Sequence, residues 1–258
     1  MNAASARRLA AVVLALLAPA AAAAQEAAPL VSDRPDFTES AETIAPGRVQ
    51  LEGGASWTAA GDTDETALGE LLARIGLTDL LELRLEPGSY EIVDPPRGGV
   101  VRGFGDGSLG VKLRLPRLAA VGAPLAALIL DAELPTGAER AGEDGVRPGA
   151  VLALAWDLGG GLGLGVNAGY RRARAGGERF DQASGSVALG WEAAPRTGLF
   201  VEWFALSRDA PGGDALHHLD GGVTRLLTDD LQLDLYAGVG LGGDAPDHFV
   251  GVGFVARF

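Results

Sequence analysis

Strict alternation of apolar and polar residues is the feature that most limits what this chain can fold into. The stretch from Leu81 to Glu86 reads LELRLE, and the stretch from Leu231 to Leu241 reads LQLDLYAGVGL. In both, one set of alternate positions is wholly apolar and the other set carries the charges. Successive side chains of a strand point to opposite faces, so the alternation predicts strands with one apolar and one charged face.

About twelve such strands recur along the chain, and each is near the ~9–11 residues that a tilted strand needs to cross a bilayer. The expected strands are residues 47–58, 66–77, 81–90, 103–115, 125–134, 149–158, 162–174, 180–193, 197–208, 215–227, 231–241 and 247–258. Mostly tight connections alternate with longer polar ones, the longer ones being residues 59–65, 91–102, 135–148, 175–179, 209–214 and 242–246. This alternation is typical of bacterial outer-membrane barrels.

The charged face must point inward, because a basic side chain facing lipid at mid-membrane costs roughly 2–4 kcal/mol. The sequence therefore predicts an all-β fold, a transmembrane antiparallel up-and-down β-barrel of about twelve strands over residues 47–258, of the bacterial outer-membrane type. Strand 247–258 should pair with strand 47–58, because an open edge in lipid leaves backbone groups without hydrogen bonds.

Residues 1–24 have the three parts of a secretory signal: a basic start at Arg7 and Arg8, an apolar middle and a small-residue cleavage site near Ala24. Its removal takes the net charge from −13 to −15, and this acidity excludes nucleic acid as a partner. The chain has no cysteine and therefore no disulfide framework. These features predict export to the outer membrane, with the barrel surrounded by lipid.

The inward charges are the predicted lining of the lumen. Our candidates for this lining are Arg74, Glu82, Arg84, Asp106, Lys112, Arg114, Glu202, Asp220 and Asp234. One interpretation is a water-filled passage for small solutes whose charges select what passes. The alternative is a non-conducting structural or binding barrel whose lumen is filled by salt bridges. Twelve strands lie between the filled eight-stranded and the open sixteen-stranded barrels, so size leaves both open.

The segment before the first strand, residues 25–46, contains SDRPDFTES and has no alternation of its own. It is acidic and interrupted by proline, as periplasmic tails without fixed structure are. The alternative is that it folds inward and occludes the lumen, with Asp33, Arg34 and Asp36 pairing with lumen charges.

A lipid-modifying enzyme is the third hypothesis, because the chain has three histidines, His217, His218 and His248. Such an enzyme needs a serine within hydrogen-bond reach of a histidine, and Ser207 is the nearest candidate in sequence. Adjacent strand residues point to opposite faces, which argues against a shared metal at His217 and His218. We therefore predict no enzymatic activity, no catalytic residues, no metal site and no cofactor.

Several short motifs resemble an outer-membrane transporter family of the meta-pathway of phenol degradation. They are SDRPDFTES at 32–40, the run from Arg74 through Thr78-Asp79 to Glu82-Leu83-Arg84, the tripeptide Pro135-Thr136-Gly137 and the terminal strand. The resemblance implies a porin-like transporter, loosely associated with aromatic or hydrophobic compounds, in a Gram-negative outer membrane. It also implies that the barrel-assembly machinery is a partner that recognises the terminal strand at Phe258. Deleting Phe258 should then lower outer-membrane levels of the protein.

Overall fold

The computed structural model describes residues 30–116, 122–138, 145–242 and 244–258, so the predicted signal sequence lies outside the described residues. These residues form one sheet of fourteen strands. The strands are β1 (Val49–Ala60), β2 (Thr63–Gly76), β3 (Leu81–Glu86), β4 (Tyr90–Asp94), β5 (Val101–Phe104), β6 (Gly107–Arg114), β7 (Leu125–Leu134), β8 (Arg147–Gly159), β9 (Leu162–Ala175), β10 (Glu178–Ala194), β11 (Thr197–Leu206), β12 (Leu216–Thr228), β13 (Leu231–Gly240) and β14 (His248–Arg257). No helix among the described residues is long and apolar enough to span a membrane.

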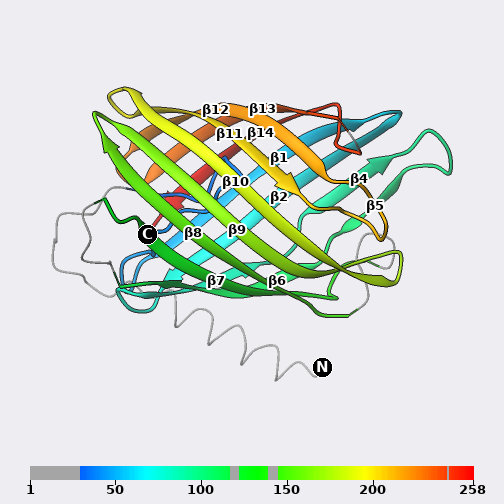
Figure 1. The fold of residues 1–258 in the computed structure, drawn as a ribbon, viewed down its shortest axis with the longest axis horizontal. Helices are drawn as coiled ribbons and strands as arrows, with labels where there is room; N and C mark the ends of the chain where they lie inside the picture. The colour runs from blue at the N-terminus through cyan, green and yellow to red at the C-terminus, as the bar shows by residue number, and fades with distance from the viewer. Residues whose placement is uncertain (1–29, 117–121, 139–144, 243) are drawn as a thin grey trace.

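The sheet closes on itself, because β1 pairs with both β2 and β14 (Figure 1). The seam between β1 and β14 runs antiparallel from Gln50 opposite Arg257 to Ala59 opposite His248. At its end the amide of Phe258 donates to the carbonyl of Val49 at 2.8 Å. This closure confirms the predicted pairing of the first and last strands and leaves no free edge there.

The fourteen labelled strands occupy twelve positions round an antiparallel barrel, which confirms the predicted fold. β3 and β4 both pair with β2, so they share one position in the barrel, interrupted at Pro87. β3 lies within the predicted strand 81–90, but β4 lies almost wholly within residues 91–102, which were expected to be a loop, so that expectation was wrong. β5 and β6 share the next position and cover most of the predicted strand 103–115. Proline cannot donate to the ladder, and Gly88 follows it with a φ of 86°, so the wall bends at this point. The β4–β5 hairpin diverges from the barrel beyond the bend (Figure 1).

A bulge in β2 sets which residues of that strand face the lumen. The pairing shifts between Glu52 and Gly54 of β1, which oppose Leu72 and Gly69. Gly69 and Glu70 have φ values of 101° and 38°, the left-handed conformation that a bulge requires. As a result Glu70 enters the lumen, where its carboxylate accepts a hydrogen bond from Ser56 at 2.6 Å.

The connections only partly follow the predicted alternation of lengths. One end of the barrel carries short turns after β2, β8, β10 and β12, and because short turns face the periplasm in such barrels we call it the periplasmic end. At the other end, β1–β2 and β9–β10 were expected to have longer loops but are joined by two-residue turns, Gly61-Asp62 and Gly176-Gly177. That expectation was wrong. Glycines with positive φ form tight turns at both places, so the strands extend beyond the residues that show apolar alternation.

The two faces of the wall differ in chemistry as the alternation predicts. On the outer face, Leu235 and Val252 are 48% and 52% exposed. On the inner face, Arg74, Glu82 and Lys112 are fully buried. The polar core of this protein is therefore its lumen, which the N-terminal segment described next partly occupies.

Candidate functional site: the lumen and its N-terminal segment

Residues 30–46 lie inside the barrel as a luminal segment (blue in Figure 1). The segment enters from the periplasmic end, where the hydroxyl of Thr43 donates to the carbonyl of Asp79 in the β2–β3 turn. The amide of Ile44 then donates to the carboxylate of Glu82 at 2.9 Å. Further in, Asp33, Arg34 and Thr38 contact side chains from several strands, so the wall holds the segment in addition to the hydrogen bonds within it, such as those from Ser40 to Asp33.

Asp33 is the centre of an ion-pair cluster on the wall formed by β1, β2, β3 and β6. Its carboxylate accepts from Arg84 at 2.5 Å, from Lys112 at 2.8 and 2.9 Å, and lies 3.3 Å from Arg74. The other acidic members are Glu39, Glu52 and Glu82. We call these seven residues the Asp33 cluster. Burial opposes ionisation of Asp33, but the three cations outweigh it and hold the pKa of its carboxyl well below the usual value.

Arg74 connects the Asp33 cluster to the backbone of the luminal segment. Its guanidinium contacts Glu82 at 2.9 Å and Glu52 at 3.0 Å. It also donates to the carbonyls of Val31 and Glu42, at 3.2 and 3.0 Å. Since Arg74, Glu52 and Glu82 are all buried, these ion pairs are fully desolvated, and removing one partner would leave a costly unpaired charge.

Arg34 crosses the seam between the first and last strands. Its guanidinium contacts Glu70 of β2 and Asp234 of β13, both at 3.3 Å. It also donates to the carbonyl of Val252 in β14. The facing pair Gly54 and Gly253 gives it room, since a Cβ at these positions would lie 2.5 and 2.3 Å from the Arg34 side chain.

A second acidic group lies on the wall formed by β11 and β12. We call Asp36, Glu202 and Asp220 the Asp36 cluster. Glu202 accepts hydrogen bonds from the amide of Phe37 at 2.6 Å and from the hydroxyl of Thr38. Among the described residues, none of the three carboxylates forms a salt bridge. Asp220 is almost fully buried, with 6% of its surface exposed, yet its Oδ1 atom has no hydrogen-bond partner. Burial, followed by the charges of Glu202 and Asp220, raises the pKa of Asp36 well above the usual value.

Aromatic rings lie beside the Asp36 cluster. Phe37 stacks on Phe204 with ring centroids 4.6 Å apart, and Phe204 stacks on His218 at 4.3 Å. Phe249 and Tyr236 extend this surface along β14 and β13. Phe37 is 41% exposed, so the stack presents an open ring to the lumen.

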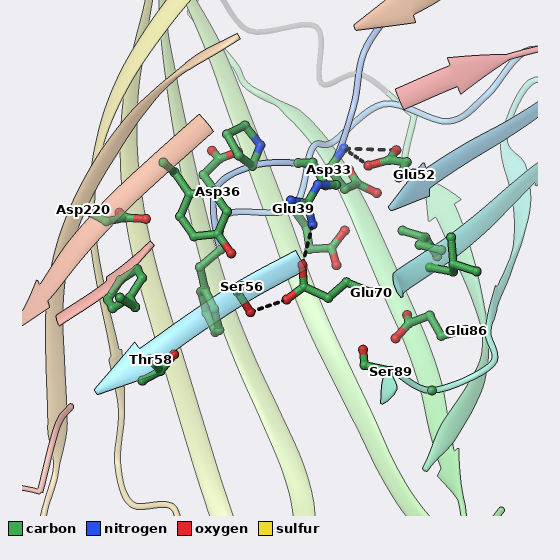
Figure 2. A pocket seen from close by; sticks show the side chains of 18 of the residues that line it. Asp33, Asp36, Glu39, Glu52, Ser56, Thr58, Glu70, Glu86, Ser89 and Asp220 are labelled. Carbon is green, nitrogen blue, oxygen red and sulfur yellow. Dashed lines mark hydrogen bonds and ion pairs between the residues drawn. The ribbon is translucent and has the colours of Figure 1, made fainter. Parts of the chain in front are cut away.

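Two cavities lie on either side of the luminal segment. The larger, about 480 Å³, is on the extracellular side and is shown in Figure 2. The smaller, about 320 Å³, reaches the β8–β9 turn at the periplasmic end and is walled by glycines including Gly161 and Gly163. Among the described residues, Asp36 and Glu39 alone line both cavities. These two carboxylates therefore lie between the two cavities.

The predicted lumen residues divide between these features. Arg74, Glu82, Arg84 and Lys112 meet in the Asp33 cluster, while Glu202 and Asp220 belong to the Asp36 cluster. Asp234 pairs with Arg34. Asp106 lines the larger cavity and pairs with Arg147 at 2.9 Å, and Arg114 lies at the periplasmic end, 3.9 Å from Glu42. Of the segment residues singled out, Asp33 and Arg34 form ion pairs, whereas Asp36 forms none with described residues.

Glu39, Glu70 and the lumen aromatics were missed by the sequence analysis. Glu39 lies in a segment without alternation, so nothing in its pattern places it beside Arg84, which it contacts at 2.9 Å. Glu70 is next to the bulge, where the alternation changes phase. Only the dipeptide Gly69-Glu70, a glycine within a strand pattern, could have indicated it.

Among the described residues, no hydrogen bond joins the serine of the enzyme hypothesis to a histidine. His217 stacks on Trp203 at 5.7 Å, whereas His218 lies in the lumen against Phe204. The hydroxyl of Ser207 accepts from the amide of Ala183 at 2.9 Å. Within the described part of the chain, no group of three histidine, cysteine or acidic residues has the arrangement that a metal ion needs.

Comparisons with solved structures show the fold of outer-membrane barrels. The chain is similar to the outer membrane channel from Pseudomonas putida F1, with 17% identity and a TM-score of 0.64, covering 88% of this chain and 100% of that one. It is also similar to the NanC porin, with 11% identity and a TM-score of 0.55, covering 81% and 100%. A KdgM porin in complex with disordered oligogalacturonate gives 10% identity and a TM-score of 0.50, covering 82% and 99%. No curated protein matches the chain.

A family model matches residues 32–258 and therefore includes both the barrel and most of the luminal segment. The match begins at the SDRPDFTES motif, where Asp33, the centre of the ion-pair cluster, lies. The chain belongs to the family described as "Putative MetA-pathway of phenol degradation".

Proposed function

We propose that this protein is an outer-membrane channel through which small solutes pass by diffusion, and that the luminal segment narrows the route. The observation that carries the proposal is the pair of cavities on the two sides of the luminal segment, which share Asp36 and Glu39 in their lining. In a non-conducting barrel, ion pairs would pack the lumen and leave no cavity, as side chains do in small barrels. Here the Asp33 cluster packs against the wall formed by β1, β2, β3 and β6, and space remains beside the wall formed by β11 and β12.

The family and the structural relatives support the same class of function. One relative is described as an outer membrane channel and two others as porins. In this proposal the apolar outer face contacts lipid, the barrel-assembly machinery recognises the terminal strand at Phe258, and the protein resides in the outer membrane. An uncharged aromatic compound fits the aromatic surface of Phe37 and Phe204 but not the surrounding carboxylates.

Single-channel recording in planar bilayers tests the proposal. We expect the chain without its signal sequence to give discrete, small conductance steps, and a variant lacking residues 30–46 to give steps several-fold larger. Heat-modifiable migration on gels is the control that both proteins are folded barrels. Silence of both proteins at saturating concentration would contradict a channel. A silent full chain with a conducting deletion variant would instead favour the non-conducting, filled barrel.

A further inference from the structure

The larger cavity has the size of a site for one small organic molecule. Its volume of about 480 Å³ lies within the ~300–1,000 Å³ that such sites occupy. It lies beyond the luminal segment on the extracellular side, so a solute entering from outside reaches it before it reaches the smaller cavity. Figure 2 shows that carboxylates enter it from several directions, with Asp36 and Asp220 on one side and Glu70 and Glu86 on the other.

The lining of this cavity is strongly acidic. Nine acidic and two basic residues line it. Both bases are already used, since Arg34 pairs with Glu70 and Asp234, and Arg84 pairs with Asp33 and Glu39. The Asp36 cluster has no cation of its own among the described residues. The cavity therefore attracts positive charge and repels anions.

Asp220 gives a second, independent indication that the larger cavity binds a ligand. Its side chain is almost fully buried, it lines the cavity, and its Oδ1 has no hydrogen-bond partner. A buried carboxylate oxygen without a partner is costly to maintain. A donor that arrives with the ligand would satisfy it.

The neighbouring rings indicate what kind of cation fits. Phe37, Phe204 and Phe249 line the same cavity as Asp220. The face of an aromatic ring attracts a cation, and the stack also offers an apolar surface. The described residues hold no cluster suited to a metal ion. Dispersed carboxylates beside aromatic rings match an ammonium group carried on an apolar body.

We propose that this cavity binds organic ammonium cations with an aromatic or apolar group, the ammonium on Asp36 and Asp220 and the apolar body on the Phe37–Phe204 stack. This inference rests on the proposed channel and names the class of solute that the channel prefers. Uncharged phenols and aromatic carboxylates are correspondingly poor ligands, because neither brings a positive charge to the Asp36 cluster.

Calorimetric titration of the detergent-solubilised barrel tests binding separately from passage. The probes are three matched molecules, 2-phenylethylammonium, 2-phenylethanol and phenylacetate. We expect the ammonium to bind and the other two to bind much more weakly or not at all. Asp220→Asn and Asp36→Asn should each weaken ammonium binding about tenfold, as loss of a hydrogen bond to a charged group does. Asp229→Asn, at the exposed periplasmic rim, is the control and should bind as the wild type does.

The other possible outcomes would contradict either this inference or the proposed channel. Equal binding of the three probes, or unchanged binding by both carboxylate variants, would overturn the inference. Asp36→Asn keeps the test valid if Asp220→Asn fails to fold, because Asp36 lies outside the barrel strands. Reversal potentials in bilayers then address passage. Bound ammonium in a silent bilayer would contradict the proposed channel but support this inference, whereas conduction without preference for the ammonium over phenylacetate would contradict this inference alone.

Discussion

The two walls of the lumen hold their carboxylates in opposite ways. In the Asp33 cluster, four carboxylates meet the three cations Arg74, Arg84 and Lys112. In the Asp36 cluster, three carboxylates meet no cation among the described residues. The first arrangement fixes the luminal segment to the wall. The second leaves charge unsatisfied at the side of a cavity, which is how functional sites commonly differ from structural ones.

Neutralising the centre of the paired cluster should have the largest effect. Asp33→Asn removes the carboxylate that contacts Arg74, Arg84 and Lys112 directly, and it leaves buried Lys112 with only the carboxylate of Glu39, at 3.7 Å, among the described residues, so we expect a loss of about 3–5 kcal/mol in the free energy of unfolding. The luminal segment should also loosen, and conductance should approach that of the variant without residues 30–46. Urea unfolding followed by tryptophan fluorescence measures the first effect. Asp229→Asn, which breaks only the exposed pair with Arg196, should cost at most about 1 kcal/mol.

Neutralising the unpaired cluster should leave stability nearly unchanged or slightly higher. Asp220→Asn removes a buried charge that has no ion pair, so we expect a change within about 1 kcal/mol in the same unfolding measurement. A loss as large as that of Asp33→Asn would show that the two clusters do not differ in the way described. The preference for cations, measured as reversal potential in a KCl gradient, should fall.

The preference for cations should rise with pH. Because the pKa of Asp36 is raised, its carboxyl is neutral at a pH where an ordinary aspartate is ionised, and it gains charge only as the pH rises through that raised pKa. Other acidic residues contribute to the electrostatic field at Asp36, namely Asp33, Glu39, Glu202 and Asp220. Stability associated with the neutral form of Asp36 is present at low pH and is lost as the pH rises through the raised pKa. Asp36→Asn should reduce the pH response, and an equal response in that variant would contradict the assignment.

Fixing the luminal segment to the wall should have the smallest effect. The hydroxyls of Thr38 and Ser186 lie 2.7 Å apart, and the chain has no cysteine that could interfere. The double variant Thr38→Cys, Ser186→Cys can therefore be oxidised to a single disulfide. If solutes pass beside a fixed segment, conductance should be the same with and without reducing agent. A drop on oxidation would mean that the segment must move.

Much of the barrel could be predicted because a bilayer allows so few solutions for a spanning chain. The alternation of LQLDLYAGVGL is enough to place Leu235 outward and Asp234 inward. The bend at Pro87 and the bulge at Gly69-Glu70 are different, since both change the phase of the alternation through backbone conformation and not through hydrophobicity. The two-residue turn at Gly61-Asp62 was missed for the same reason.

The site was less predictable than the wall. Arg74, Arg84 and Lys112 could be assigned to the lumen from strand parity, but their partners could not be paired from it. Asp33 and Glu39 come from a segment without periodicity, and their positions depend on contacts with strands that are distant in sequence. The aromatic surface was hidden because Phe204 and Phe249 look like ordinary strand residues in the sequence.

The position of Arg34 has a consequence for the order in which the protein is built. Its guanidinium touches β2, β13 and β14 at once, over the seam where Gly54 faces Gly253. That binding surface exists only after the first and last strands have paired. The contacts of Arg34 can therefore form only after the barrel has closed, although the luminal segment precedes every strand in the sequence. We expect this part of the segment to be fixed in place late in folding, after the contacts of Asp33 with β3 and β6 have become possible.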